Sequence, residues 1–209
     1  MKRFIYLFIA AFAITSCQKD PDMDDLDNDF LVYTSYDAKA DFASFTNYVL
    51  PDSILLIGGG NKAEYWKGED AQEIIDAFVA GMDGRGYTRV TEKDQADLGI
   101  QLSYVKQVTY YVGYDSPYWW YYYPYYWAPG YWGNWYGWYY PYAVYYGYTS
   151  GSMLAEAVDL KAEQGAGHKL PVVWNAFLGG LLSSSGRYNL DRTLQAVDQA
   201  FVQSPYLKK

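Results

Sequence analysis

The chain has 209 residues, with 24 acidic residues, 16 basic residues and a formal net charge of −8 at pH 7. This acidic balance argues against nucleic acid as a partner, because a negative surface repels phosphates. The single cysteine excludes an intramolecular disulfide, and the length suits one domain behind a leader.

The first 16 residues are typical of a secretory signal peptide. Lys2 and Arg3 precede an apolar run from Phe4 to Ile14, which is shorter than the roughly 20 residues that span a bilayer. Small residues stand directly before Cys17, as in the bacterial lipobox, where cleavage before the cysteine is followed by its lipidation. We therefore expect a lipid on Cys17 that attaches the protein to a membrane. The alternative is a plain signal peptide with an incidental cysteine.

Residues 17–30 are expected to form an acidic, flexible tether. Six acids lie between Asp20 and Asp29 against one lysine, which is too much charge to bury. The start of this stretch resembles the surface-export signal of Bacteroidetes lipoproteins, and Gln18 resembles residues that permit sorting to the outer membrane. The sequence thus predicts an outer-membrane lipoprotein, on the periplasmic face or the cell surface. An ordinary solvated linker is the alternative.

Residues 31–209 are predicted to form a single α+β domain. Apolar runs and strict alternation indicate an antiparallel or mixed sheet of about five strands. The predicted strands are Phe30–Tyr36, Phe45–Leu50, Ile54–Ile57, Leu98–Val105 with an extension to Val108, Ser152–Lys161 and Leu170–Leu178.

Two amphipathic helices are expected to pack on one face of this sheet. The first runs from about Glu69 to Met82 and is stopped by Gly84 and Gly86. The second runs from about Asn189 to Gln203, with Asn189 as its N-cap and Pro205 after its end.

An aromatic insertion at about residues 111–148 separates two of the predicted strands. In the Tyr/Trp-rich segment, Tyr110–Tyr148, 23 of 39 positions are Tyr or Trp, and no charged residue occurs between Ser116 and Ala155. Cores are normally built from Leu, Ile and Val, so this composition indicates a surface for contact. Pro129-Gly130 near its midpoint favours a turn, hence a projecting hairpin or loop.

The sequence holds no catalytic or metal-binding constellation. His168 is the only histidine and lies among glycines, Gly58–Gly60 lacks the spacing of a phosphate loop, and Ser183–Ser185 lacks a nucleophile elbow. The acids between Asp22 and Asp29 lack the spacing of a calcium loop, and Glu69, Asp70 and Glu73 fit an exposed helix start. We expect a protein that is not an enzyme and needs no cofactor or metal.

Several short motifs resemble bacterial lipoproteins of the domain-of-unknown-function family 4136. The resemblance rests on the lipobox, the closing helix that ends in Ser204-Pro205, the aromatic insertion, and the motifs Tyr36-Asp37, Asp41-Phe42 and Phe45-Thr46-Asn47-Tyr48. It covers about Phe30 to Leu207 and implies an α+β domain on a lipid anchor. It implies no reaction, cofactor or catalytic residue.

The Tyr/Trp-rich segment allows several kinds of contact. Association with envelope proteins or with further copies of the chain is our leading interpretation, because Tyr and Trp dominate protein interfaces. Glycans stacked on the rings, or rings resting on the membrane interface or on the domain's own sheet, are the alternatives. The candidate binding residues are Tyr118, Trp119, Trp120, Tyr125, Trp127, Tyr131, Trp132, Trp135, Tyr136 and Trp138.

Overall fold

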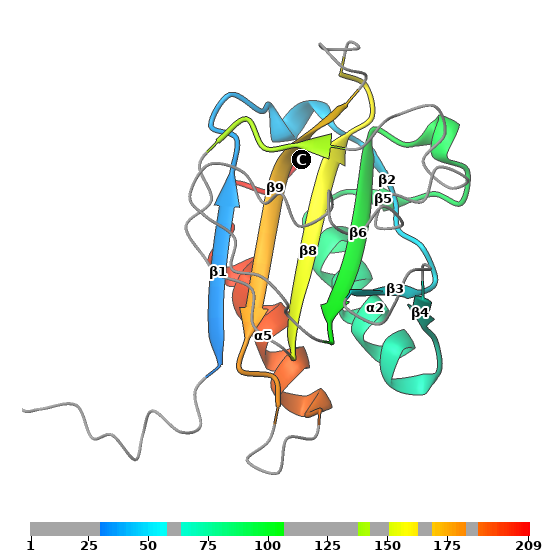
Figure 1. The fold of residues 1–209 in the computed structure, drawn as a ribbon. Helices are drawn as coiled ribbons and strands as arrows, with labels where there is room; N and C mark the ends of the chain where they lie inside the picture. The colour runs from blue at the N-terminus through cyan, green and yellow to red at the C-terminus, as the bar shows by residue number, and fades with distance from the viewer. Residues whose placement is uncertain (1–29, 58–63, 107–137, 143–150, 163–168, 183–187) are drawn as a thin grey trace, which may run out of the picture.

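The computed structural model describes residues 30–57, 64–106, 138–142, 151–162, 169–182 and 188–209. These residues form a mixed sheet of nine strands with two α-helices (Figure 1), which confirms the predicted α+β class. The strands are β1 (Leu31–Tyr36), β2 (Asn47–Val49), β3 (Ile54–Ile57), β4 (Glu64–Trp66), β5 (Thr88–Arg89), β6 (Leu98–Val105), β7 (Trp138–Tyr139), β8 (Ser152–Asp159) and β9 (Leu170–Gly179). The helices are α2 (Glu69–Asp83) and α5 (Leu190–Val202), and short 3-10 turns span Phe42–Ser44 and Lys93–Gln95.

The centre of the sheet is antiparallel. β8 lies between β6 and β9, and β1 pairs with the other side of β9, so that Leu31 is opposite Gly179 and Tyr36 is opposite Trp174. On the far side of β6, the short strands β2 and β3 run parallel to it, and β5 continues the sheet beside β2. The strands β6 and β8, which flank the Tyr/Trp-rich segment in the sequence, are therefore direct neighbours in the sheet.

The strands β2 and β3 follow the same edge of β6 but are not continuous. β2 is opposite Leu98 and Gly99, whereas β3 is opposite Ser103 to Val105. Pro51 lies in the break, and proline has no N–H to give to a ladder. Among the described residues, no strand pairs with this edge of β6 at Ile100–Leu102.

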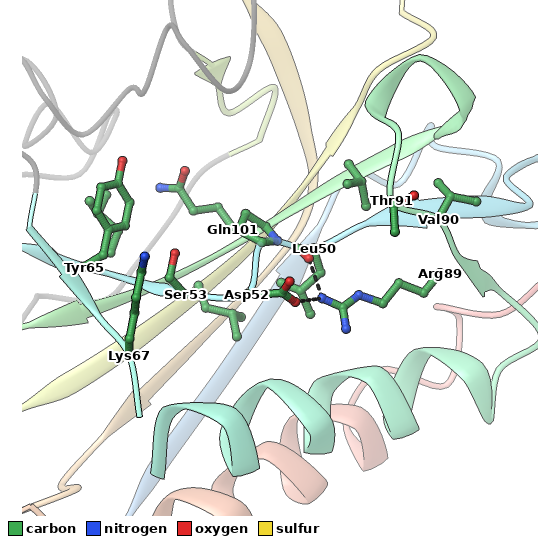
Figure 2. A pocket seen from close by; sticks show the side chains of 13 residues that line it. Leu50, Asp52, Ser53, Tyr65, Lys67, Arg89, Val90, Thr91 and Gln101 are labelled. Atoms are coloured by element: carbon green, nitrogen blue, oxygen red, sulfur yellow. Dashed lines mark hydrogen bonds and ion pairs between the residues drawn. The ribbon is translucent and has the colours of Figure 1, made fainter. Parts of the chain in front are cut away.

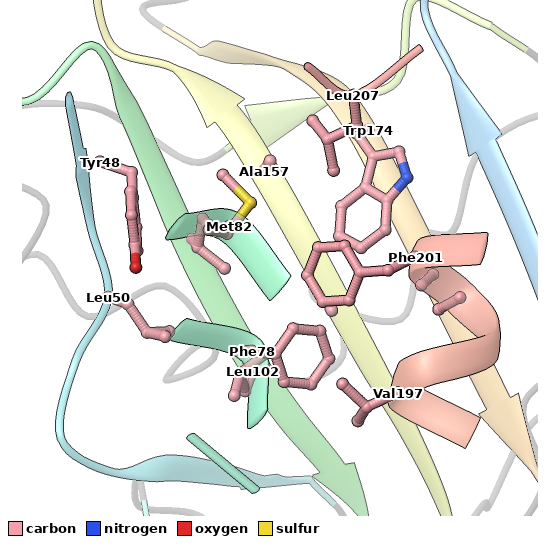
Figure 3. Close-up of a cluster of buried hydrophobic side chains, with 14 of the residues drawn as sticks. Tyr48, Leu50, Phe78, Met82, Leu102, Ala157, Trp174, Val197, Phe201 and Leu207 are labelled. Carbon is pink, nitrogen blue, oxygen red and sulfur yellow. The ribbon is translucent and has the colours of Figure 1, made fainter. Parts of the chain in front are cut away.

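Both helices lie on one face of the sheet, as the sequence predicted (Figure 1). Phe201 of α5 sits where the helices meet the sheet, with its ring centroid 5.8 Å from that of Phe78 in α2 and 6.0 Å from that of Trp174 in β9 (Figure 3). The inward residues of the helices are Ala71, Ile74, Ile75, Phe78 and Met82 in α2, and Thr193, Ala196, Val197, Ala200 and Phe201 in α5. Their helical spacing explains why both segments are helices and why they bury these faces.

The ends of the helices agree with the expected signals. The side chain of Asn189 accepts a hydrogen bond from the backbone N–H of Arg192 at 3.1 Å, which confirms the predicted N-cap of α5. α2 ends at Asp83, and Gly86 after it adopts a φ of +90°, a conformation that favours glycine.

The second face of the sheet is also buried. Its apolar cluster consists of Val49, Leu55, Ile57, Ala96, Val105, Trp138, Leu154, Val158, Leu170, Val172 and Phe177. This face therefore belongs to the interior of the domain, although neither described helix covers it.

The structure adds three strands that the sequence did not predict, β4, β5 and β7, each only two or three residues long. The predicted strand Phe45–Leu50 is shorter in the structure, where only Asn47–Val49 pairs, because a 3-10 turn precedes it and Pro51 follows it. Strands of this length carry too few positions to show an alternating pattern.

Candidate functional site

The described end of the Tyr/Trp-rich segment, Trp138–Tyr142, lies against the second face of the sheet. Trp138 is 1% exposed, packs in the apolar cluster of that face and pairs with Leu170 at the start of β9. The prediction that Trp138 belongs to an exposed binding surface is therefore wrong, because β7 pairs with β9 and buries this side chain in the apolar cluster. Its neighbour Tyr139 remains 39% exposed.

Two tyrosines of this end are hydrogen-bonded to polar groups of the sheet. The hydroxyl of Tyr140 donates to the carboxyl of Glu156 in β8. The hydroxyl of Tyr142 donates to Oδ1 of Asn175 in β9 at 2.9 Å. The two rings meet edge to face, with centroids 5.6 Å apart and an interplanar angle of 83°. Both contacts fix the end of the segment to specific positions on adjacent strands.

Glu156 and Asn175 belong to a row of polar residues that crosses the sheet. The register places Gln101 of β6 opposite Glu156, Glu156 opposite Asn175, and Asn175 opposite Ser35 of β1. Gln101 also donates from Nε2 to the hydroxyl of Ser103 at 3.3 Å. A buried polar row of this kind is stable only when its members are hydrogen-bonded.

The side chain of Glu156 is completely buried in this row. Burial raises the pKa of Glu156 well above its ordinary value of 4.5, because the charged form loses its hydration. A protonated carboxyl can accept the hydroxyl of Tyr140 and still donate a hydrogen bond of its own. Burial thus favours the neutral form of Glu156, which links β8 to Tyr140 of the Tyr/Trp-rich segment.

Sequence reasoning missed this row, although it left a signal. Glu156 and Asn175 each stand as a single polar residue inside an apolar run of a central strand, whereas Gln101 belongs to the alternating pattern of β6. Such a position predicts a buried polar group with partners. The alignment of all three side chains across the strands depends on the register, which the sequence alone does not reveal.

A cavity of about 630 Å³ opens at the break between β2 and β3 (Figure 2). Its walls come from the connection Leu50–Ser53, from Tyr65 and Lys67 at β4, from Arg89–Thr91 at β5, and from Gln101 and Leu102 of β6. These segments are far apart in the sequence, and no motif predicted the cavity.

The remaining predicted residues lie outside the described part of the chain. They are Cys17, Tyr118, Trp119, Trp120, Tyr125, Trp127, Tyr131, Trp132, Trp135 and Tyr136, together with the excluded candidates Asp22–Asp29, Gly58–Gly60, His168 and Ser183–Ser185. The acids Glu69, Asp70 and Glu73 are exposed at the start of α2, as expected. Within the described residues, no group of three His, Cys, Asp or Glu side chains could hold a metal ion.

Neither described helix is sufficiently long and apolar to cross a bilayer.

Comparison with known proteins places this domain in a family. The family model described as "Domain of unknown function (DUF4136)" matches residues 32–206. No match was found among the curated proteins. The crystal structure of a DUF4136 family protein from Bacteroides thetaiotaomicron VPI-5482 is similar, with 48% sequence identity and a TM-score of 0.78 over 87% of this chain and 99% of that chain. The chain therefore belongs to the DUF4136 family.

Proposed function

We propose that the protein is a non-catalytic lipoprotein of the outer membrane whose Tyr/Trp-rich segment binds envelope proteins or further copies of the same chain. The observation that carries this proposal is the anchored end of the segment. Trp138 is buried, and Tyr140 and Tyr142 are hydrogen-bonded to Glu156 and Asn175 of the sheet. This described end of the segment is thus built into the domain, which supports a contact role for the aromatic residues that precede it in the sequence.

The composition of the segment supports protein contact over other uses. With 23 Tyr and Trp residues among 39, it holds more large aromatic area than a free monomer usually exposes. Such side chains lose little entropy on binding and carry much of the affinity of protein interfaces. Without Trp138, the proposed contact residues are Tyr118, Trp119, Trp120, Tyr125, Trp127, Tyr131, Trp132, Trp135 and Tyr136.

Membrane attachment is the second part of the proposal. The signal peptide and the lipobox end at Cys17, and several acyl chains on this cysteine would hold the protein at the bilayer. Replacing Cys17 with Ala should abolish incorporation of labelled palmitate and release the protein from outer-membrane fractions. A Cys17→Ala protein that remains in those fractions without label would contradict lipid anchoring.

Substitution within the segment tests the contact role. The full-length protein with Trp119, Trp120, Trp127, Trp132 and Trp135 changed to Ser should lose its crosslinks to envelope partners or to itself in intact cells. The same five positions changed to Tyr form the matched control, which should keep most crosslinks because the aromatic area is retained. All five lie before Trp138, so the buried end of the segment is left intact.

A polysaccharide pull-down with the same variants distinguishes protein association from the main alternative, glycan binding. Trp and Tyr faces can stack on sugar rings, but sugar sites usually add Asp, Asn or Arg, and Asp115 and Asn134 are the only such residues in the sequence of the segment. If the Trp→Ser variant lost polysaccharide retention but kept its protein crosslinks, the segment would bind glycans rather than proteins. Unchanged results in both assays would exclude both.

A further inference from the structure

We propose that the cavity at the break between β2 and β3 is a binding site for a small molecule that carries a carboxylate. Its volume of about 630 Å³ lies in the range of small-molecule sites. None of the described residues of the Tyr/Trp-rich segment lines it, so the proposal is independent of the function proposed above.

Arg89 supplies the first fixed cation of the cavity. Its guanidinium reaches from β5 toward the Leu50–Ser53 connection (Figure 2), and Nη2 donates to the carbonyl of Leu50 at 2.7 Å and to Oδ1 of Asp52 at 2.6 Å. Its side chain is only 27% exposed. Nε and Nη1 make no hydrogen bond to any described residue, so this guanidinium keeps donors for a ligand.

Lys67 supplies a second cation from the opposite side of the cavity, next to Tyr65 and Ser53 (Figure 2). No carboxylate of the described residues lies within ion-pair distance of its ammonium, in contrast to Lys106 and Lys161, which pair with Glu64 and Asp97. Within the described part of the chain, Lys67 is therefore a cation without a counter-charge, in a protein of net charge −8.

The other polar groups of the cavity add donors. Ser53, Tyr65 and Thr91 also line it, and their hydroxyls make no hydrogen bond to any described residue. Among the described residues of the lining, Asp52 is the only one with a carboxylate; its side chain is 80% exposed and already paired with Arg89. Two cations against one carboxylate that is already paired fit an anionic ligand, and a planar carboxylate matches a guanidinium.

The wall of the cavity indicates what the carboxylate is attached to. Val49, Leu55 and Val90 provide apolar surface, and the ring of Tyr65 is 43% exposed at the rim. A compact apolar or ring-shaped body would cover this wall while its carboxylate meets the cations. A free carboxylic acid and a uronic acid residue of a polysaccharide share this chemistry.

Calorimetric titration of the full-length protein in detergent tests the site. The probes are cyclohexanecarboxylate and galacturonate, their uncharged counterparts cyclohexanemethanol and galactose, and inorganic phosphate. Lys67→Met and Arg89→Gln remove the two cations. Lys208→Met is the matched control, because Lys208 is exposed and lies outside the cavity lining.

We expect saturable binding of at least one carboxylate, weakened about tenfold or more by Lys67→Met and unchanged by Lys208→Met. Preference for galacturonate would identify the polysaccharide source, and preference for cyclohexanecarboxylate a free acid. Arg89→Gln also removes the hydrogen bond to Leu50, so a loss of binding in that variant could reflect a change in structure. Lys67→Met removes no hydrogen bond or ion pair with the described residues and is therefore the deciding variant.

Three results would overturn the proposal. They are equal binding of the charged and uncharged probes, tighter binding of phosphate than of either carboxylate, and no saturable binding of any probe at millimolar concentration. If Lys67→Met left carboxylate binding unchanged, the binding site would lie elsewhere on the protein, which would also contradict the proposal. The crosslinking assay of the Tyr/Trp-rich segment is unaffected by any of these outcomes.

Discussion

The indole N–H of Trp174 donates to the hydroxyl of Ser204 at 2.9 Å, and both side chains are fully buried. Trp174 lies in β9 and Ser204 follows the end of α5, so this single bond joins the middle of the sheet to the turn that ends the last helix. Phe201 stacks on the same indole with an interplanar angle of 22°. The contact fixes the depth at which α5 sits on the sheet.

Replacing Ser204 with Ala should lower the free energy of unfolding by about 1–3 kcal/mol, because the buried indole N–H loses its partner. Urea unfolding followed by tryptophan fluorescence measures the change. The exposed neighbour Gln203 is the control, since Gln203→Ala should stay within about 0.5 kcal/mol of the parent. Equal stability of the Ser204→Ala protein would mean that another group accepts the N–H.

Gly81 in α2 lies directly beneath Phe201. A Cβ atom at this position would stand 2.2 Å from Cε2 of Phe201, which is far inside van der Waals contact. Glycine to alanine within a helix normally stabilises by up to about 1 kcal/mol, but Gly81→Ala should destabilise by about 1–3 kcal/mol through overpacking. Thermal unfolding measures the sign. Adding Phe201→Leu should recover part of the loss, and purely additive effects would rule out the clash.

The buried carboxyl of Glu156 makes stability depend on pH. Burial raises the pKa of Glu156 in the folded protein, so the folded state holds its proton to higher pH than the unfolded chain does. Its neutral form contributes fully below about pH 4.5, and stability falls as the pH rises toward the folded pKa by at most about 1.4 kcal/mol per pH unit. Glu156→Gln, which cannot ionise but keeps an acceptor for Tyr140, should therefore gain stability over the parent from pH 5 to pH 8.

Urea unfolding at both pH values tests this expectation, with the exposed Glu73→Gln as the control. A Glu156→Gln protein that differs from the parent by the same amount at pH 5 and pH 8 would show that the carboxyl is ionised in the fold.

The carboxyl of Asp97 makes stability depend on pH in the opposite direction. Burial would raise the pKa of Asp97, but the backbone N–H groups of Thr46 and Asn47, at 2.6 and 3.2 Å, and the ammonium of Lys161 at 3.1 Å outweigh it, so the pKa is lowered. A lowered folded pKa gives stability that is present above the unfolded pKa and is lost as the pH falls through the folded pKa. Asp97→Asn should cost about 1–3 kcal/mol at pH 7 and much less near pH 2.5.

Chemical denaturation at the two pH values measures the effect of Asp97→Asn. Asp94→Asn is the control, because Asp94 is exposed in the neighbouring 3-10 turn. An equal loss of unfolding free energy at both pH values would mean that the cost of Asp97→Asn does not come from the charge of the carboxylate.

The helices could be predicted because their patterns extend over several turns. Ile74, Ile75, Phe78 and Met82 repeat at helical spacing, and each is buried in α2. The long strands were visible for a similar reason. The short strands β4 and β5 could not be predicted, since the residues that bond them to the sheet are supplied by β3 and β2 rather than by a local pattern.

The composition of the Tyr/Trp-rich segment suggested a contact surface, but it could not separate core rings from surface rings. Trp138 and Tyr139 are adjacent aromatics, yet one is 1% and the other 39% exposed. Both residues pair with β9, and successive side chains of a strand point to opposite faces, so only one of the two is buried. Which one is buried depends on this long-range pairing. The cavity between β2 and β3 was hidden for the same reason, because its lining is assembled from distant segments.

The pairing of β1 with β9 also bears on when this domain can fold. Leu31 of β1 pairs with Gly179 of β9, so β1 cannot join the sheet through β9 until almost the whole polypeptide has been synthesised. Sheets closed by such distant contacts form slowly, because the loss of chain entropy precedes the gain from pairing. A nascent chain emerging from the ribosome therefore cannot complete its native sheet before Gly179 has been synthesised.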